Sequence, residues 1–101
     1  MSKSLLNLVN TIRERKNNDE DKSYTSSLLS GGLSKCIDKM EEEFSELKEA
    51  LNDKSNIVHE AADTIYHILV TLEAADIKFE DVLKELEDRK KQSGIEEKNN
   101  R

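Results

Sequence analysis

Proline is absent from this 101-residue chain, and the sequence contains one cysteine and three glycines. Without proline, and with long stretches rich in Glu, Lys and Leu, the composition favours an all-α fold. The single cysteine, Cys36, excludes an internal disulfide framework and fits a reducing compartment. The sequence has no strand pattern followed by a glycine-rich phosphate loop, which argues against P-loop and dinucleotide-binding folds.

Basic stripes and long apolar runs are also missing. The net charge is −6, which disfavours a general binder of nucleic acid or of anionic membranes. No apolar run approaches the roughly 20 residues that cross a bilayer, and the N-terminal residues do not begin a signal peptide. We therefore expect a cytoplasmic protein with no nucleic-acid or membrane partner.

Helical spacing of apolar residues predicts four main helices, at about 4–16, 33–51, 57–75 and 79–91. A short helical turn through Leu28 precedes a stop at Gly31-Gly32. The helix over 57–75 is apolar around most of its circumference, so we expect it to be central and its carboxylates to be recessed. These elements form one domain, residues 1–92, followed by a charged tail, residues 93–101.

The small size of the domain predicts a partner copy. A chain of this length buries only roughly 60–65% of the surface of its unfolded state. Most soluble oligomers are symmetric. We therefore expect a small helical bundle that is completed by homodimerisation.

Two acidic clusters are the most informative feature that the sequence does contain. They comprise Glu42, Glu43 and Glu46 in the helix over 33–51, and Glu60 and Asp63 in the helix over 57–75. Residues three apart in a helix project from nearly the same face. From 55 to 77 there is no Lys or Arg, so the second cluster lacks a local counter-charge. Carboxylates brought together without cations resist ionisation, and a hard divalent cation such as Mg²⁺, which prefers oxygen ligands, removes that conflict.

The acids also have a plainer interpretation as solvated surface. That interpretation is strong for the first cluster alone, because Lys48 lies close by in the same helix. It is weaker for Glu60 and Asp63, because a recessed and unpaired charge is costly. Taken together, the two clusters favour a metal site.

Two lysines and two histidines lie near the acids. Lys35 and Lys39 either pair with acids three or four residues further on or attract phosphate beside a metal. His67 is expected to hydrogen-bond Asp63 or the backbone rather than to ligate metal, since an oxygen-rich set suits Mg²⁺ better than Zn²⁺. His59 is expected to be a surface residue.

The acidic residues match a known signature, ExxE, a spacer and ExxD. Here it reads Glu43-Phe44-Ser45-Glu46 and then Glu60-Ala61-Ala62-Asp63, with Glu42 as the preceding acid. The match extends through Ser23-Tyr24-Thr25, the helix segment 60–70 and Ser93-Gly94-Ile95-Glu96-Glu97-Lys98. The chain therefore resembles the phosphoribosyl-ATP pyrophosphohydrolases, which are MazG-like all-α enzymes. It departs from their pattern at Glu41, where glycine is common, and at Phe44, where a small residue is usual.

The resemblance implies hydrolysis of a nucleotide, phosphoribosyl-ATP, to phosphoribosyl-AMP and pyrophosphate with Mg²⁺ as cofactor, the second step of histidine biosynthesis. Our hypothesis assigns Glu43, Glu46, Glu60 and Asp63 as metal ligands, and Glu42 as a further catalytic acid that activates water. Substrate contacts are expected from Lys35, Lys39, Tyr24 and Thr25.

Two other functions stay open at this point. One is a pyrophosphohydrolase of the same superfamily that acts on another (deoxy)nucleoside triphosphate. The other is a non-catalytic helical interaction module whose acids are plain surface. The Ser-Tyr-Thr and Ser-Gly-x-Glu-Glu-Lys stretches favour phosphoribosyl-ATP over the first.

Overall fold

The computed structural model describes residues 3–16 and 23–90, and this part of the chain forms five helices and no strand. They are α1 (Lys3–Arg15), α2 (Tyr24–Ser30), α3 (Gly32–Asp53), α4 (Ile57–Ala74) and α5 (Phe79–Arg89). The all-α prediction is confirmed, and the expected bounds of the main helices agree within two residues. The predicted tail and its Ser-Gly-x-Glu-Glu-Lys stretch lie outside the described residues.

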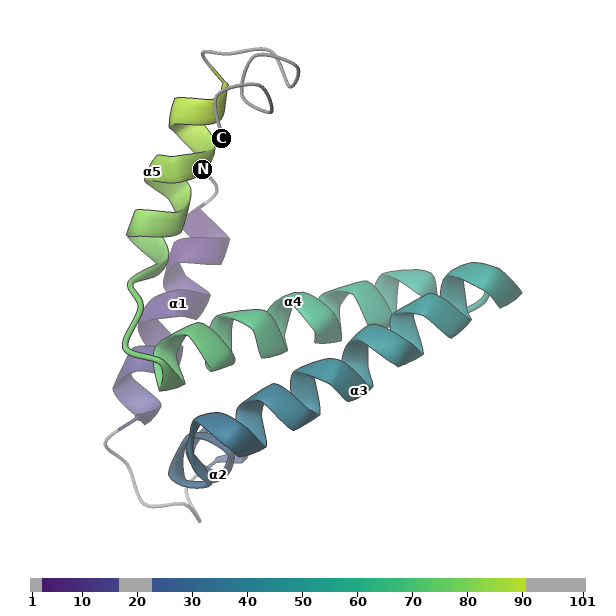
Figure 1. Cartoon of the computed structure of the whole chain (residues 1–101), viewed down its shortest axis with the longest axis horizontal. Helices are drawn as coiled ribbons and strands as arrows, with labels where there is room; N and C mark the ends of the chain where they lie inside the picture. Colours follow the sequence, from purple (N-terminus) through teal and green to yellow (C-terminus); the bar gives the residue numbers. More distant parts are fainter. Residues whose placement is uncertain (1–2, 17–22, 91–101) are drawn as a thin grey trace.

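The helices α3 and α4 form a long antiparallel hairpin (Figure 1). The other three helices gather around one end of it, where α3 begins and α4 ends (Figure 1). Lys54 and Asn56, in the turn of the hairpin, both adopt positive φ. Asn56 occupies the N-cap position of α4, but its side chain makes no capping hydrogen bond.

Two threonines of α4 fix the register of this hairpin. The hydroxyl of Thr64 donates to the carbonyl of Glu60 in its own helix, at 2.8 Å, and also points at the carbonyl of Glu43 in α3, at 3.2 Å. Thr71, seven residues further along α4, is 3.2 Å from the carbonyl of Cys36, seven residues earlier on α3. A helical threonine commonly bonds the carbonyl four residues back. Here the same hydroxyl also bridges to the neighbouring helix, so both contacts set one alignment.

The core lies at the end of the hairpin where the other helices gather. Its buried apolar members are Val9, Ile12, Leu28, Cys36, Leu69 and Val70. Because α4 contacts all four other helices, its central place is confirmed. One face of α4 is nevertheless left open by this chain, since Val58 is 85% exposed and Ile65 is 51% exposed.

Ion pairs connect the end of α1 to the end of α4, to the turn after it and to the start of α5. Arg13 pairs with Glu80 and with Glu73, while Lys16 pairs with Asp76 and Glu73. The Arg13 guanidinium, by hydrogen bonding, lowers the pKa of Glu80 to about 2. No residue of α5 is buried, so these polar contacts supplement a small apolar interface. Within the described ranges, no helix has the length and apolarity needed to cross a membrane.

Candidate functional site

The predicted metal ligands meet across the interface between α3 and α4. Glu43 and Glu46 of α3 and Glu60 of α4 each place one carboxylate oxygen within 4.8 Å of the other two. Asp63 belongs to a second group, with Glu60 and His59, whose ligand atoms also lie within 4.8 Å of one another. The four predicted residues are therefore brought together in two groups that share Glu60.

Two oxygens of this cluster are buried without a hydrogen-bond partner, and they are Oε2 of Glu43 and Oε2 of Glu60. A buried oxygen that is ionised and unpaired is costly. Burial, and next the charge of Glu46, raise the pKa of Glu43 and also that of Glu60. A divalent cation placed among these oxygens would offset both the cost of burying their charge and the repulsion between them. The all-oxygen set formed by Glu43, Glu46 and Glu60 is also the donor chemistry of Mg²⁺, so these residues fit a metal centre.

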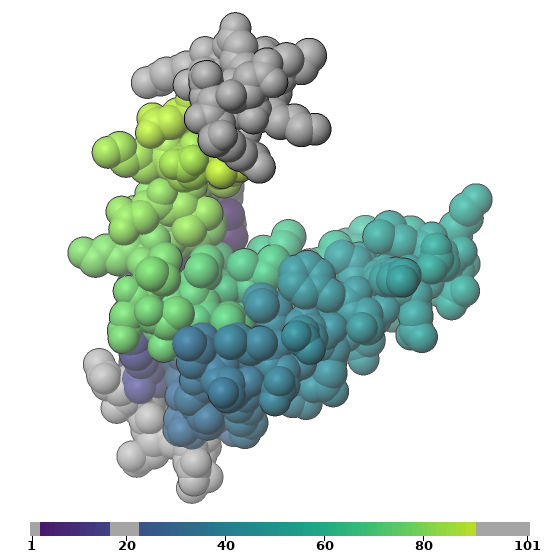
Figure 2. Space-filling model, in the orientation of Figure 1, coloured from purple at the N-terminus to yellow at the C-terminus, as the bar shows by residue number. Residues whose placement is uncertain are grey.

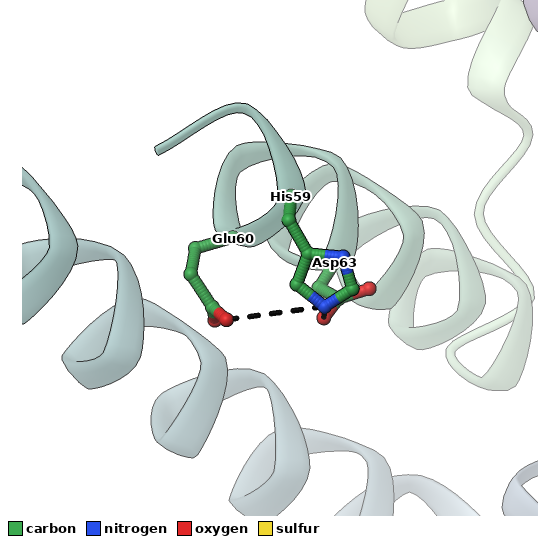
Figure 3. Close-up of side chains that lie close together, drawn as sticks. All are labelled: His59, Glu60 and Asp63. Atoms are coloured by element: carbon green, nitrogen blue, oxygen red, sulfur yellow. Dashed lines mark ion pairs between the residues drawn. The ribbon is translucent and has the colours of Figure 1, made fainter. Parts of the chain in front are cut away.

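A histidine lies against the second cluster, where the sequence places no Lys or Arg. Nε2 of His59 lies 3.2 Å from Oδ2 of Asp63 and 4.0 Å from Oε1 of Glu60 (Figure 3). The side chain of His59 is 64% exposed, so the surface position predicted for it is confirmed. The i,i+4 spacing of His59 and Asp63 is the signal that points to this pairing, and a search restricted to Lys and Arg misses it.

The acid that precedes the signature lies outside both carboxylate groups. The carboxylate of Glu42 is 61% exposed and pairs with Nζ of Lys39 at 3.4 Å. For Lys39, the structure thus gives the plain i,i+3 pairing that the sequence allowed. Lys35 is exposed, and its aliphatic stem lies against Gly31 at the start of α3.

Tyr24 and Thr25 lie at the start of α2 and contact α4. The Tyr24 hydroxyl is 3.2 Å from Nε2 of His67, and the Tyr24 ring stacks on Tyr66 with centroids 6.3 Å apart. Thr25 is buried, and its hydroxyl bonds that of Tyr66. Nδ1 of His67 is 2.9 Å from the carbonyl of Asp63, which confirms the backbone hydrogen bond predicted for this histidine.

An open hollow adjoins the carboxylates on the side of the hairpin turn. Its volume is about 280 Å³. It is lined by Glu46, Glu49, Ala50, Asp53, Ser55, Asn56 and Glu60. The cluster is therefore reached from solvent through a polar opening.

Known proteins resemble this chain over most of its length. Residues 5–90 match the family model described as phosphoribosyl-ATP pyrophosphohydrolase. Among curated relatives, the phosphoribosyl-ATP pyrophosphatase of Rhizobium etli is 42% identical, over 97% of this chain and 94% of that protein. The proteins of the same name from Paracoccus denitrificans and Ruegeria pomeroyi are 44% and 45% identical, each over 93% of this chain, and over 89% and 91% of their own lengths.

Proposed function

Because this chain belongs to the phosphoribosyl-ATP pyrophosphohydrolase family, we propose that the carboxylates shared between α3 and α4 form the centre for that family's reaction. The protein is a phosphoribosyl-ATP diphosphatase of histidine biosynthesis, which releases pyrophosphate and leaves phosphoribosyl-AMP. One observation supports the site above all others. Glu43, Glu46 and Glu60 are within reach of one ion, and two of them carry buried oxygens without partners.

In this proposal Glu43, Glu46, Glu60 and Asp63 hold Mg²⁺. The ion, when bound, supplies neutralisation of phosphate charge and a more acidic water. The carboxylates of the chain set where it binds, and the burial of Glu43 and Glu60 keeps competing water away from part of the site. The mutual repulsion of the acids, which raises the pKa of Glu43 and of Glu60, supports this assignment, because a nearby cation favours the charged form of a carboxylate.

Lys39 and Glu42 have complementary parts in the proposed reaction. Their exposed ion pair is weak, so a substrate phosphate can take the lysine from the glutamate. The freed Glu42 carboxylate then accepts a proton from the water that attacks the α-phosphorus. The bond from that phosphorus to the α–β bridging oxygen breaks, and pyrophosphate leaves with its electrons. Lys35 is proposed to attract the outer phosphates.

The test of this function is release of pyrophosphate from phosphoribosyl-ATP. We expect turnover with millimolar Mg²⁺ and none after removal of divalent ions with a chelator. In competition with deoxynucleoside triphosphates, phosphoribosyl-ATP should be consumed first. Preferential consumption of a deoxynucleotide would instead support the alternative enzyme of the same superfamily. If no pyrophosphate were released from any of these substrates, that result would contradict a catalytic function.

We also propose a homodimer formed through the outer face of the α3–α4 hairpin. Large apolar side chains that are more than a third exposed lie along it: Leu33, Ile37, Phe44 and Leu51 on α3, and Val58 and Ile65 on α4. The hairpin extends well beyond the rest of the molecule (Figure 2). The radius of gyration, 15.6 Å, exceeds the roughly 13 Å of a compact domain of 100 residues. A second hairpin packed on this face would complete a four-helix bundle around a two-fold axis.

Charge placed on this face should separate the two copies. Phe44→Glu and Ile65→Glu are expected to give the monomer mass of 11.6 kDa in light scattering, whereas the unmodified protein gives twice that mass. Leu86→Glu is the control, because Leu86 is 51% exposed but lies on α5, away from the hairpin face. A wild-type protein that is already monomeric at assay concentration would contradict the dimer.

A further inference from the structure

The tautomer of His67 follows from its two hydrogen-bond partners. The side chain is 4% exposed, so its ring nitrogens depend on protein partners. Nδ1 lies 2.9 Å from the carbonyl of Asp63, and a carbonyl can only accept. In the neutral ring one nitrogen donates and the other accepts. In this neutral form, Nδ1 carries the hydrogen and Nε2 is the accepting nitrogen.

This tautomer fixes the direction of the hydrogen bond to Tyr24. Nε2 of His67 is 3.2 Å from the Tyr24 hydroxyl. Since Nε2 accepts, the hydroxyl must donate, and its single hydrogen is used. The oxygen keeps lone pairs that can accept a further hydrogen bond. Among the described residues, His67 is the hydrogen-bond partner that the structure gives this hydroxyl.

Tyr24 is open to solvent and lies beside the acidic site. The residue is 57% exposed. Partial burial raises the pKa of its phenol, while the charge of Lys39 lowers it and those of Glu43 and Asp63 raise it further. Through His67, the phenol is also connected by hydrogen bonds to the main chain of Asp63, one of the proposed metal ligands. A substrate whose phosphates meet that metal would bring its adjoining sugar close to Tyr24.

We propose that His67 orients Tyr24 as a hydrogen-bond acceptor for a hydroxyl of the ribose that carries the triphosphate. This inference rests on the proposed function, because it takes the phosphates to lie at the carboxylates. An ionised phosphate oxygen has no hydrogen to donate, and the Tyr24 hydrogen is already used, so the two are poorly matched. A sugar hydroxyl can donate and is well matched. Tyr24 is then a binding residue and His67 a positioning residue.

The experiment compares phosphoribosyl-ATP with its 2′-deoxy and 3′-deoxy counterparts. For the wild type we expect kcat/KM to fall about tenfold for one of the two deoxy substrates, the typical effect of one hydrogen bond. Tyr24→Phe keeps the ring that stacks on Tyr66 but removes the acceptor. It should lower kcat/KM for the ribose substrate about tenfold, leave the rate on that deoxy substrate unchanged, and so abolish the preference.

Two further variants separate orientation from structure. His67→Phe removes the accepting nitrogen and leaves the hydroxyl hydrogen of Tyr24 free, so the ribose preference should fall although the phenol is present. Tyr66→Phe is the matched control: its hydroxyl bonds Thr25 instead, and the preference should persist. Melting temperatures check that each variant is folded.

The outcomes distinguish this inference from the function on which it rests. A wild type that hydrolyses phosphoribosyl-ATP without any ribose preference overturns the role of Tyr24 alone. So does a preference that survives in Tyr24→Phe. A wild type that releases no pyrophosphate from phosphoribosyl-ATP with Mg²⁺ overturns the proposed function and this inference with it.

Discussion

Glu46→Gln and Asp63→Asn are each expected to lower kcat for pyrophosphate release by about 100-fold or more, with helical content unchanged. Each substitution replaces a charged oxygen with a neutral amide in the proposed Mg²⁺ ligand set, and the loss of one preorganised electrostatic contact at a reacting centre typically costs that much. Glu46 is exposed and the side chain of Asp63 is 40% exposed, so neither amide leaves a cavity in the core. Rates at saturating substrate with millimolar Mg²⁺, together with circular dichroism, measure both parts of the prediction.

Glu41→Gln is the matched control for these two variants. Glu41 is an exposed acid of the same helix as Glu46, and it belongs to neither carboxylate group. It should keep wild-type turnover and the same Mg²⁺ dependence. Normal Mg²⁺-dependent turnover in both Glu46→Gln and Asp63→Asn would contradict the assigned ligands.

Mg²⁺ is expected to raise the melting temperature of the wild type by roughly 10–20 °C when its concentration is 100 times its dissociation constant. Binding at that excess adds about 2.7 kcal/mol to stability, and each kcal/mol shifts the melting temperature of a 100-residue domain by about 4–8 °C. Sodium chloride at equal ionic strength should not reproduce the shift. The measurement is thermal unfolding followed by circular dichroism.

The double variant Glu60→Gln plus Asp63→Asn tests the repulsion among the carboxylates by removing two of their charges. It should lose the Mg²⁺ shift, yet melt a few degrees above the wild type when no metal is present, because two like charges are gone. A non-catalytic interaction module would show no Mg²⁺ shift and no change in the double variant. That pair of results would contradict the metal centre.

The raised pKa values give the metal-free protein a pH dependence of known sign. For Glu43 and Glu60 the pKa in the folded state lies above the ordinary value of 4.5. Their contribution to stability is therefore fully present below pH 4.5 and is lost as pH rises through the raised values. Glu80 acts oppositely, since its pKa of about 2 gives stability above pH 4.5 that is lost as pH falls toward 2. Mild acidification from neutral pH should thus raise the melting temperature of the metal-free wild type, and less so in the double variant.

The fold and the grouping of the carboxylates were predictable because both depend on local spacing. Apolar residues at helical intervals located the helices, and the ExxE and ExxD spacings placed each pair of carboxylates on one face. That the two pairs meet across one interface followed from the expectation that the helix with Glu60 is central. The backbone hydrogen bond of His67 was predictable for the same reason, because its partner is one turn away.

The remaining features depend on tertiary neighbours. The bond between Tyr24 and His67 joins residues 43 apart in the sequence, and no local pattern encodes it. The side chains of Val58 and Ile65 look like core residues by periodicity, yet the single chain leaves them exposed. Periodicity reports that a face is apolar, but not whether the same chain or another copy covers it.

The threonine contacts of α4 have a consequence for how the ion would be received. The Thr64 hydroxyl lies between the backbone carbonyls of Glu43 and Glu60. The side-chain carboxylates of the same two residues are proposed metal ligands. A slip of α3 along α4 by one turn, about 5.4 Å, would break this bridge and the one at Thr71 together. The alignment of the two helices, and with it the spacing of the acids, is therefore set by hydrogen bonds to main-chain carbonyls rather than by a bound cation. The proposed metal site is preorganised, and the free energy of ion binding would not have to include the cost of aligning the helices.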